Sequence, residues 1–171
     1  MPASKHAAVH RTTRSARVPA AEAHAVHVSL EGERTPVAAR RLEALSRYVL
    51  AGEGVPRAMI SITLLSTRAM SRLNREHLGH RGATDVITFA LGDDGSGMLV
   101  ADIYICPDVA RAQAAAWHVG VRDELLRLVV HGTLHACGWE HPVDEGREGS
   151  PMWQRQERLL ARWQRTRAAH A

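Results

Sequence analysis

The sequence predicts an α+β domain in which a mixed sheet of about four strands is packed with helices. Three observations lead to this fold class. Alternating or wholly apolar runs, typical of strands, occur at four places in the chain. Helical patterns separate the first three runs, which favours parallel pairing of the early strands. The last two runs are joined only by the turn sequence GDDGSG, which predicts an antiparallel hairpin.

The element boundaries follow from capping and breaking residues. Thr35 is a candidate N-cap with Pro36 at the first helical position, and Gly52 and Gly54 are expected to stop that helix. Thr67 is expected to cap the next helix, and Gly138 to end a later one. The expected strands are 24–30, 57–66, 84–91 and 98–106, and the expected helices are 37–52, 70–78, 107–118, 121–137 and 152–167.

Length and composition predict one domain with a basic extension. A chain of 171 residues with 45% apolar residues can bury one sizeable core and is too short to suggest two. Residues 1–20 carry Lys5, Arg11, Arg14 and Arg17 without any acid, which equals the formal net charge of +4. We expect residues 1–22 to be a disordered basic extension, although the composition also suits a transit peptide.

The end of the chain is basic as well. Its last helix carries five arginines against a single acid, and residues 21–150 are therefore net acidic. Basic termini can contact phosphate backbones, but a solvated surface explains them as simply. The arginines are Arg155, Arg158, Arg162, Arg165 and Arg167.

The remaining composition predicts a cytoplasmic protein without a membrane partner. No apolar run approaches the roughly 20 residues that span a bilayer, and the N-terminus lacks the apolar stretch of a secretory signal. Cys106 and Cys137 are too few for a disulfide framework and suit a reducing compartment.

The sequence HGTLHACGWEHP, residues 131–142, predicts a metal site on a helix in the C-terminal half and on the loop that follows. His131 and His135 are four residues apart and therefore project from one helical face. Gly138 ends the helix, so that His141 can supply a third nitrogen from the returning chain. Three imidazoles leave a fourth position open for water, as in catalytic zinc sites, and we expect one Zn²⁺ per chain.

The segment also has other interpretations. The histidines can be surface or core residues placed together by chance, but their spacing and the apolar segment LLRLVV before them favour a metal site. Cys137 points away from His135 on the helix and is expected to be a reduced core thiol. The spacing is similar to that of metzincin proteases, which have a glutamate after the first histidine, where this chain has Gly132. A peptidase of that kind is therefore not expected.

Three motifs carry a resemblance to a known family. HGTLHACGWEH resembles H-G-x-L-H-L-x-G-Y-D-H, a motif of the YbeY family of bacterial endoribonucleases, with Ala136, Trp139 and Glu140 in place of Leu, Tyr and Asp. LNREHLGHRGATDVITF resembles the segment that this family carries around a P-T-D/N-V sequence, and ADIYIC resembles its G-D/E-I/L-x-I strand. The motifs occur in the family's order and intervals, and the resemblance covers approximately residues 24–163.

The resemblance implies a single-strand-specific, zinc-dependent endoribonuclease. It implies a role in 16S rRNA 3′-end maturation and ribosome quality control, with ribosomal RNA and the small ribosomal subunit or its assembly factors as partners. His131, His135 and His141 take the positions of the metal ligands, so we expect residues 23–167 to form a single metal-dependent catalytic domain.

Other site residues are less defined by the sequence. Many members have an arginine where this chain has Leu78, and Arg81 or Arg75 are weak candidates to replace it catalytically. Glu140 is a candidate to orient an imidazole from outside the ligand set, or a loop acid. Asp85 and Asp102 lie on expected strands and have no assignable catalytic role.

Two other functions fit the same residues. One is a metallohydrolase that acts on another substrate, and the other is a non-catalytic zinc-containing ribosome-assembly factor. The leucine at position 78 gives the second alternative some support.

Overall fold

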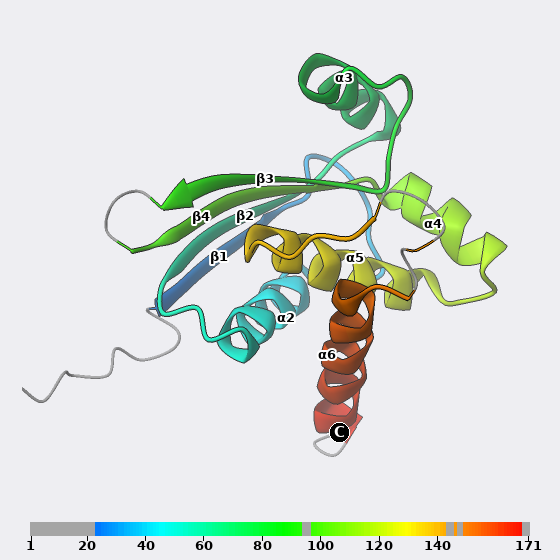
Figure 1. Ribbon diagram of the computed structural model, residues 1–171. Coiled ribbons are helices and arrows are strands. Elements are labelled where there is room, and N and C mark those ends of the chain that lie inside the picture. The colour runs from blue at the N-terminus through cyan, green and yellow to red at the C-terminus, as the bar shows by residue number, and fades with distance from the viewer. Residues whose placement is uncertain (1–22, 94–96, 143–145, 147–148, 169–171) are drawn as a thin grey trace, which may run out of the picture.

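The computed structural model describes residues 23–93, 97–142, 146 and 149–168. Four strands and five long helices occur there in the order that the sequence predicts (Figure 1). The strands are β1 (His24–Ser29), β2 (Ala58–Leu64), β3 (Val86–Asp93) and β4 (Leu99–Ile105). The helices are α2 (Ala39–Gly52), α3 (Thr67–Leu78), α4 (Pro107–Ala116), α5 (Val121–Ala136) and α6 (Pro151–Ala168).

The sheet is mixed and has the strand order β1-β2-β4-β3. β1 pairs with β2 and β2 pairs with β4 in parallel, while β3 and β4 form an antiparallel hairpin with a bulge between Ala90 and Gly92. The expected mixed four-stranded sheet, the parallel pairing of the first two strands and the hairpin are confirmed, whereas β3 lies beyond β4 and does not pair with β2. β3 is an edge strand of this sheet, and it borders the site described below.

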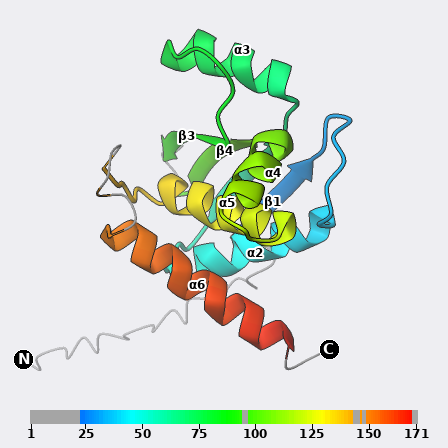
Figure 2. The same ribbon diagram turned by 90° about the vertical axis from the view of Figure 1, so that its right-hand side faces the viewer.

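Helices cover both faces of the sheet. α2 and α5 pack on one face, with α6 across them, while α3 stands on the other side (Figures 1 and 2). The main core lies beneath α2 and α5 and includes Leu45, Ile62, Ile103 and Leu134, each fully buried. A smaller core around Met70 and Ile87 seats α3 against the opposite face. The space between α3 and α5 is therefore bordered by β3.

Two predicted helix starts are wrong. The chain bends at Pro36 and Val37, Val37 is buried in the core with 1% of its surface exposed, and α2 begins only at Ala39 after the extended N-cap residue Ala38. Thr35 accepts a hydrogen bond from the Val37 amide at 3.2 Å without capping the helix. Ser66, not Thr67, caps α3 by accepting a hydrogen bond from the Ala69 amide at 3.3 Å.

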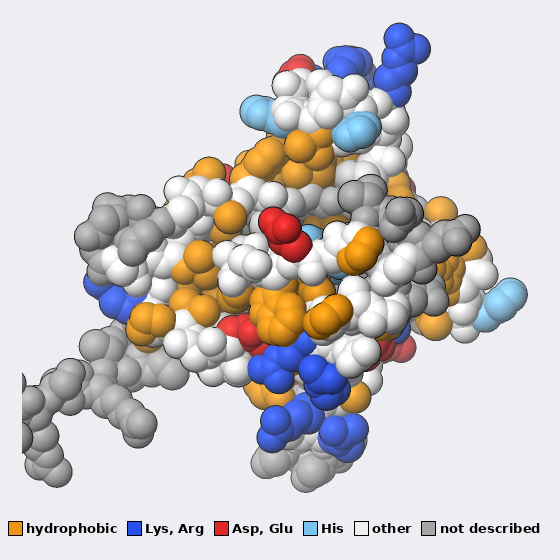
Figure 3. Space-filling model, in the orientation of Figure 1, with side chains coloured by type: hydrophobic (Ala, Val, Ile, Leu, Met, Phe, Trp, Pro, Cys, Tyr) orange, Lys and Arg blue, Asp and Glu red, His pale blue; other side chains and the backbone are white. Residues whose placement is uncertain are grey.

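The surface agrees in part with the charge pattern of the sequence. Basic side chains gather over α6, and hydrophobic ones gather beneath α3 (Figure 3). The proposed extension at residues 1–22 lies outside the described residues. Among the described residues, no helix is both long enough and apolar enough to cross a membrane.

Candidate metal centre

α5 carries two of the three histidines into the space beside β3. The helix packs tightly on the sheet at Gly132, where a Cβ atom would lie 2.7 Å from Cγ2 of Ile103 and 3.2 Å from Oγ1 of Thr88. Only glycine permits this approach, so it fixes the helix against β3 and β4. His131 is 4% exposed on the neighbouring position, and His135 follows one turn later, half-buried.

The third histidine returns from a turn at the end of α5. Gly138 has a φ of +86°, the left-handed conformation that favours glycine at a helix C-terminus. Its amide donates to the His135 carbonyl at 2.9 Å, and the next amide, of Trp139, donates to the Leu134 carbonyl at 3.0 Å. The Trp139 indole then donates to Glu53, the C-cap residue of α2, at 2.8 Å, which anchors the returning chain.

The three imidazoles converge on one point. Nε2 of His131 lies 3.1 Å from Nε2 of His135 and 3.3 Å from Nε2 of His141. The candidate ligand atoms of all three lie within 4.8 Å of one another. Tetrahedral zinc with bonds of about 2.0–2.1 Å separates its ligand nitrogens by about 3.3 Å. The two distances from Nε2 of His131 therefore match the spacing of a tetrahedral zinc site.

Hydrogen bonds set the tautomer of two of the imidazole rings. Nδ1 of His131 lies 2.8 Å from Oε1 of Gln156, and Nδ1 of His141 lies 2.7 Å from the Pro142 carbonyl oxygen. Both partners are acceptors, so each Nδ1 carries the proton and each Nε2 of the neutral ring presents a lone pair. Two lone pairs that face each other at 3.3 Å call for a shared cation. This donor chemistry fits a metal ion.

A hydrogen-bond chain from α6 to α5 holds Gln156 in this orientation. Gln156 is fully buried, and its amide nitrogen donates to Oε1 of Glu157 at 3.0 Å, which turns the amide oxygen toward His131. Arg127 donates to the same Glu157 oxygen at 3.0 Å and to Glu124 at 2.6 Å. Burial opposes the charge of Arg127, but hydrogen bonds and attraction from Glu157 and Glu124 outweigh it and raise its pKa.

The contact that orients His131 comes from a residue that the sequence did not single out. Glu140 is exposed on the rim of the cavity, whereas Gln156, 25 residues away from His131, orients that ring. The sequence does contain a signal for it. Gln156 interrupts the apolar stripe of α6 formed by Met152, Leu159 and Leu160.

The histidines open into a cavity of about 760 Å³ between α3, β3 and the loop after α5. Leu78 and His80 line its α3 side, and Phe89 and Trp139 supply aromatic surface. Leu78 is 47% exposed and lines the same cavity as the three histidines.

The structure does not bring the two arginine candidates to this cavity. Arg75 and Arg81 are exposed and are not among the residues that line it. Asp85 lines the cavity, but its carboxylate accepts hydrogen bonds from the Val86 amide at 2.8 Å and from Gln113 at 3.2 Å. These bonds indicate a structural role for Asp85.

Two further sequence candidates lie away from the metal centre. Asp102 alternates with the buried Ile103 on β4 and therefore lies on the sheet face opposite α5. Cys137 at the end of α5 is half-buried, and burial together with the negative charge of Glu53 raises its pKa to about 11. Its thiol stays protonated at neutral pH, which agrees with the expected reduced thiol that does not bind metal.

Comparison with known proteins agrees with this geometry. The family model described as Endoribonuclease YbeY matches residues 27–164. A protein of that name from Frankia alni is 39% identical over 152 residues, which cover 81% of this chain and 82% of the relative. Another from Bacillus licheniformis is 34% identical over 139 residues, which cover 75% of this chain and 87% of the relative.

A solved structure is similar as well. The solution structure of TM1509 from Thermotoga maritima aligns with a TM-score of 0.58 and 25% sequence identity. The alignment covers 84% of this chain and 93% of that one.

Proposed function

Because this chain belongs to the YbeY family of endoribonucleases, we propose that it is a zinc-dependent endoribonuclease that cuts single-stranded RNA. The observation that carries the proposal is the convergence of three Nε2 atoms, two of them fixed as lone-pair donors by partners on Nδ1. The family supplies the reaction class, and the histidines supply a site for the metal.

His131, His135 and His141 would hold the ion. Bound zinc would supply positive charge to offset the negative charge that develops on the attacked phosphate, and it would activate water at neutral pH. The chain's own residues position these parts. Gln156 and the Pro142 carbonyl keep the proton on Nδ1 of their rings, and Gly132 holds α5 against the sheet.

The cavity lining suits an unpaired strand. Phe89 and Trp139 offer aromatic surface on which unstacked bases can pack. His80 and Thr84 line the same cavity and can donate hydrogen bonds to phosphate oxygens. A duplex would present its bases already stacked and paired, which leaves this aromatic surface unused.

The proposal extends to a biological role through the family resemblance. We expect this chain to act in the cytoplasm on ribosomal RNA, in 16S rRNA 3′-end maturation and ribosome quality control. Its partners would be the small ribosomal subunit or its assembly factors.

Alanine substitutions of the histidines test the function. His131→Ala, His135→Ala and His141→Ala are each expected to lose stoichiometric zinc and the cleavage of a single-stranded RNA oligonucleotide. His27→Ala, on the exposed side of β1, is the matched control and should keep both. Full cleavage by all three histidine variants would disprove the proposal.

A non-catalytic ribosome-assembly factor is the second candidate, because Leu78 lines the cavity where the resemblance places an arginine. It predicts that zinc-loaded protein binds ribosomal particles but cuts no RNA, and that Leu78→Arg does not create activity. Cleavage by the unaltered chain would exclude it. A metallohydrolase of another specificity would instead show in a substrate panel. A peptidase of the metzincin kind is disfavoured because no glutamate side chain fits at Gly132.

A further inference from the structure

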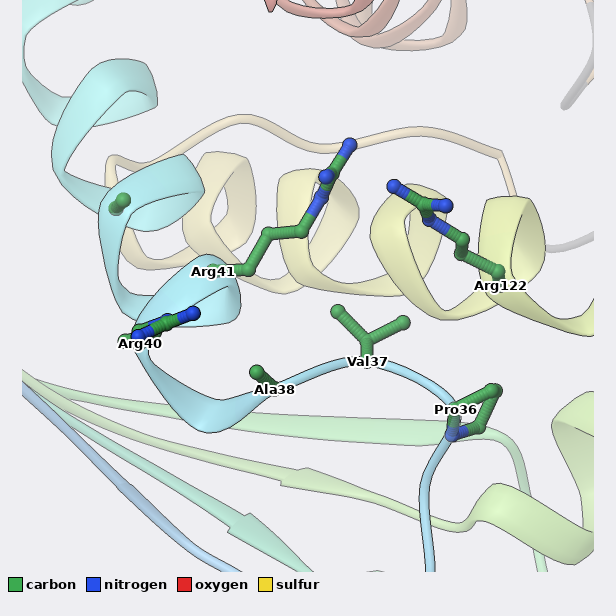
Figure 4. Close-up of a pocket in the computed structure, with 7 residues that line it drawn as sticks. Pro36, Val37, Ala38, Arg40, Arg41 and Arg122 are labelled. Carbon is green, nitrogen blue, oxygen red and sulfur yellow. The ribbon is translucent and has the colours of Figure 1, made fainter. Parts of the chain in front are cut away.

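A second cavity lies at the other end of α5, between the first turns of α2 and α5 (Figure 4). Its volume is about 430 Å³. Among the described residues that line it, the charged ones are Arg40, Arg41 and Arg122, and the others are Pro, Val and Ala. A cavity with three cationic side chains and no acidic one attracts an anion.

The guanidinium groups approach the cavity from two helices. Arg41 of α2 and Arg122 of α5 extend toward each other above Val37, and Arg40 lies on the near side of the first turn (Figure 4). Arg41 is half-buried, whereas Arg40 and Arg122 are exposed. Facing cations repel, and an anion between them turns this repulsion into attraction.

The position of these arginines along their helices is a separate observation. All three lie in the first turn, where the helix dipole disfavours positive charge. The first turn of α2 has no acidic residue, and its N-cap Ala38 makes no side-chain hydrogen bond. The dipole of α2 and the arginine side chains therefore favour the same kind of ligand.

The lining also indicates which anion fits. The planar guanidinium fork matches the oxygens of a phosphate group. The apolar remainder of the lining offers no aromatic side chain for stacking and no polar side chain that could read a base edge. The cavity is suited to bind phosphate charge without sequence preference.

We propose that this arginine cavity binds a phosphate group of the RNA backbone, outside the segment that is cut at the histidines. The inference rests on the proposed ribonuclease function and adds a second contact to it. From Arg122 to His135 the axis of α5 rises about 20 Å. A stacked strand advances about 3.4 Å per nucleotide, so a strand in that conformation needs about six nucleotides to reach both sites.

Binding of RNA of two lengths tests the proposal. The affinities of the full chain for a 20-nucleotide and a 3-nucleotide single strand are measured by fluorescence anisotropy across a salt series, with strand integrity checked on a gel. For the longer strand, Arg41→Gln/Arg122→Gln should weaken binding about 5-fold per lost phosphate contact at 0.1 M salt and lower the salt slope by about 0.7. Binding of the shorter strand should change less than twofold.

Two matched variants separate the cavity from net charge and from folding. Arg57→Gln/Arg68→Gln removes the same charge from exposed positions outside the cavity and should change affinity less than twofold. Arg41→Lys/Arg122→Lys keeps the charge and should restore most of the salt slope. If the double glutamine variant melts early, Arg122→Gln alone should shift affinity in the same direction, because Arg122 is exposed.

Several results would overturn the proposal. The proposal is wrong if Arg41→Gln/Arg122→Gln binds the 20-nucleotide strand as tightly as the unaltered chain. It is also wrong if the two double glutamine variants lose equal RNA affinity. If Arg41→Gln/Arg122→Gln lost binding of inorganic phosphate but kept RNA affinity, the cavity would be a site for free anions. If it lost binding of polyglutamate but kept RNA affinity, the cavity would bind an acidic protein partner. RNA binding without cleavage by the unaltered chain would refute the ribonuclease function and leave the cavity proposal standing.

Discussion

Gln156→Leu is predicted to weaken zinc binding while it leaves the metal-free fold intact. The amide oxygen of Gln156 is the acceptor for Nδ1 of His131 at 2.8 Å, inside the core. Without it, the metal-free ring can move its proton to Nε2 and avoid a buried unsatisfied donor. Zinc must then displace that proton and return it to an Nδ1 that has no partner.

The magnitude follows from this asymmetry. A buried donor without an acceptor costs roughly 1–3 kcal/mol, which corresponds to about 5- to 150-fold in zinc affinity. The cost falls on the metal-bound state, because only that state forces the proton onto Nδ1. The midpoint of urea unfolding of the metal-free protein should change little, since leucine fills a similar volume in the core.

Competition with a chromophoric chelator measures the zinc affinity, and circular dichroism follows unfolding. Gln156→Glu retains an acceptor for Nδ1 and is expected to keep affinity within about threefold, as in carboxylate–histidine–zinc arrangements. Gln164→Leu, on the exposed side of α6, is the matched control. If Gln156→Leu binds zinc as tightly as the unaltered chain, the orienting role of this amide is refuted.

Three further predictions concern residues in and just after the C-terminal part of α5. Gly132→Ala places a methyl group 2.7 Å from Ile103. Overpacking costs about 1–3 kcal/mol, and the higher helix propensity of alanine returns about 1 kcal/mol. The free energy of unfolding, measured in urea, should therefore fall by roughly 1 kcal/mol. Gly138→Ala strains a φ of +86° and should weaken zinc binding by displacing the third histidine, whereas Gly32→Ala, with a φ of +82°, carries similar strain and should not. The pKa of Cys137 rises from 9.0 to about 11, so its alkylation at pH 8, followed by mass spectrometry, should be about a hundredfold slower than that of a free thiol. The Cys137 thiol loses its proton at lower pH in the unfolded chain than in the folded one. The contribution of this thiol to stability is therefore complete below pH 9 and is lost as the pH rises toward about 11. Equal alkylation rates of Cys137 in folded and unfolded protein would contradict the raised pKa.

Local patterns in the sequence were sufficient for most of the fold and for the three histidines. The helical spacing of His131 and His135 and the break at Gly138 are properties of a few adjacent residues, and the structure has them as expected. The predicted start of α2 was wrong, because burial of Val37 in the core outweighed the capping preference of Thr35. Such a competition between a local preference and a distant contact is not visible in a local pattern.

The parts of the site that were missed all depend on distant contacts. Gln156 reaches His131 from a helix that begins after the loop, and Glu53 receives Trp139 from the end of α2. The pairing of β2 with β4, which places the hairpin at the sheet edge, sets which side chains line the cavity. Arg75 was a candidate by sequence proximity alone, and it points to solvent.

The close packing at Gly132 affects how the protein would gain and lose metal. Zinc fingers have too small a core to fold without metal, whereas here the core beneath α2 and α5 is built from apolar side chains. Because α5 is already held against the sheet, its two histidines stay in register without an ion. Metal exchange would then be a local event at the surface of a folded protein, and the active fraction would follow the supply of metal while the amount of folded protein stays constant.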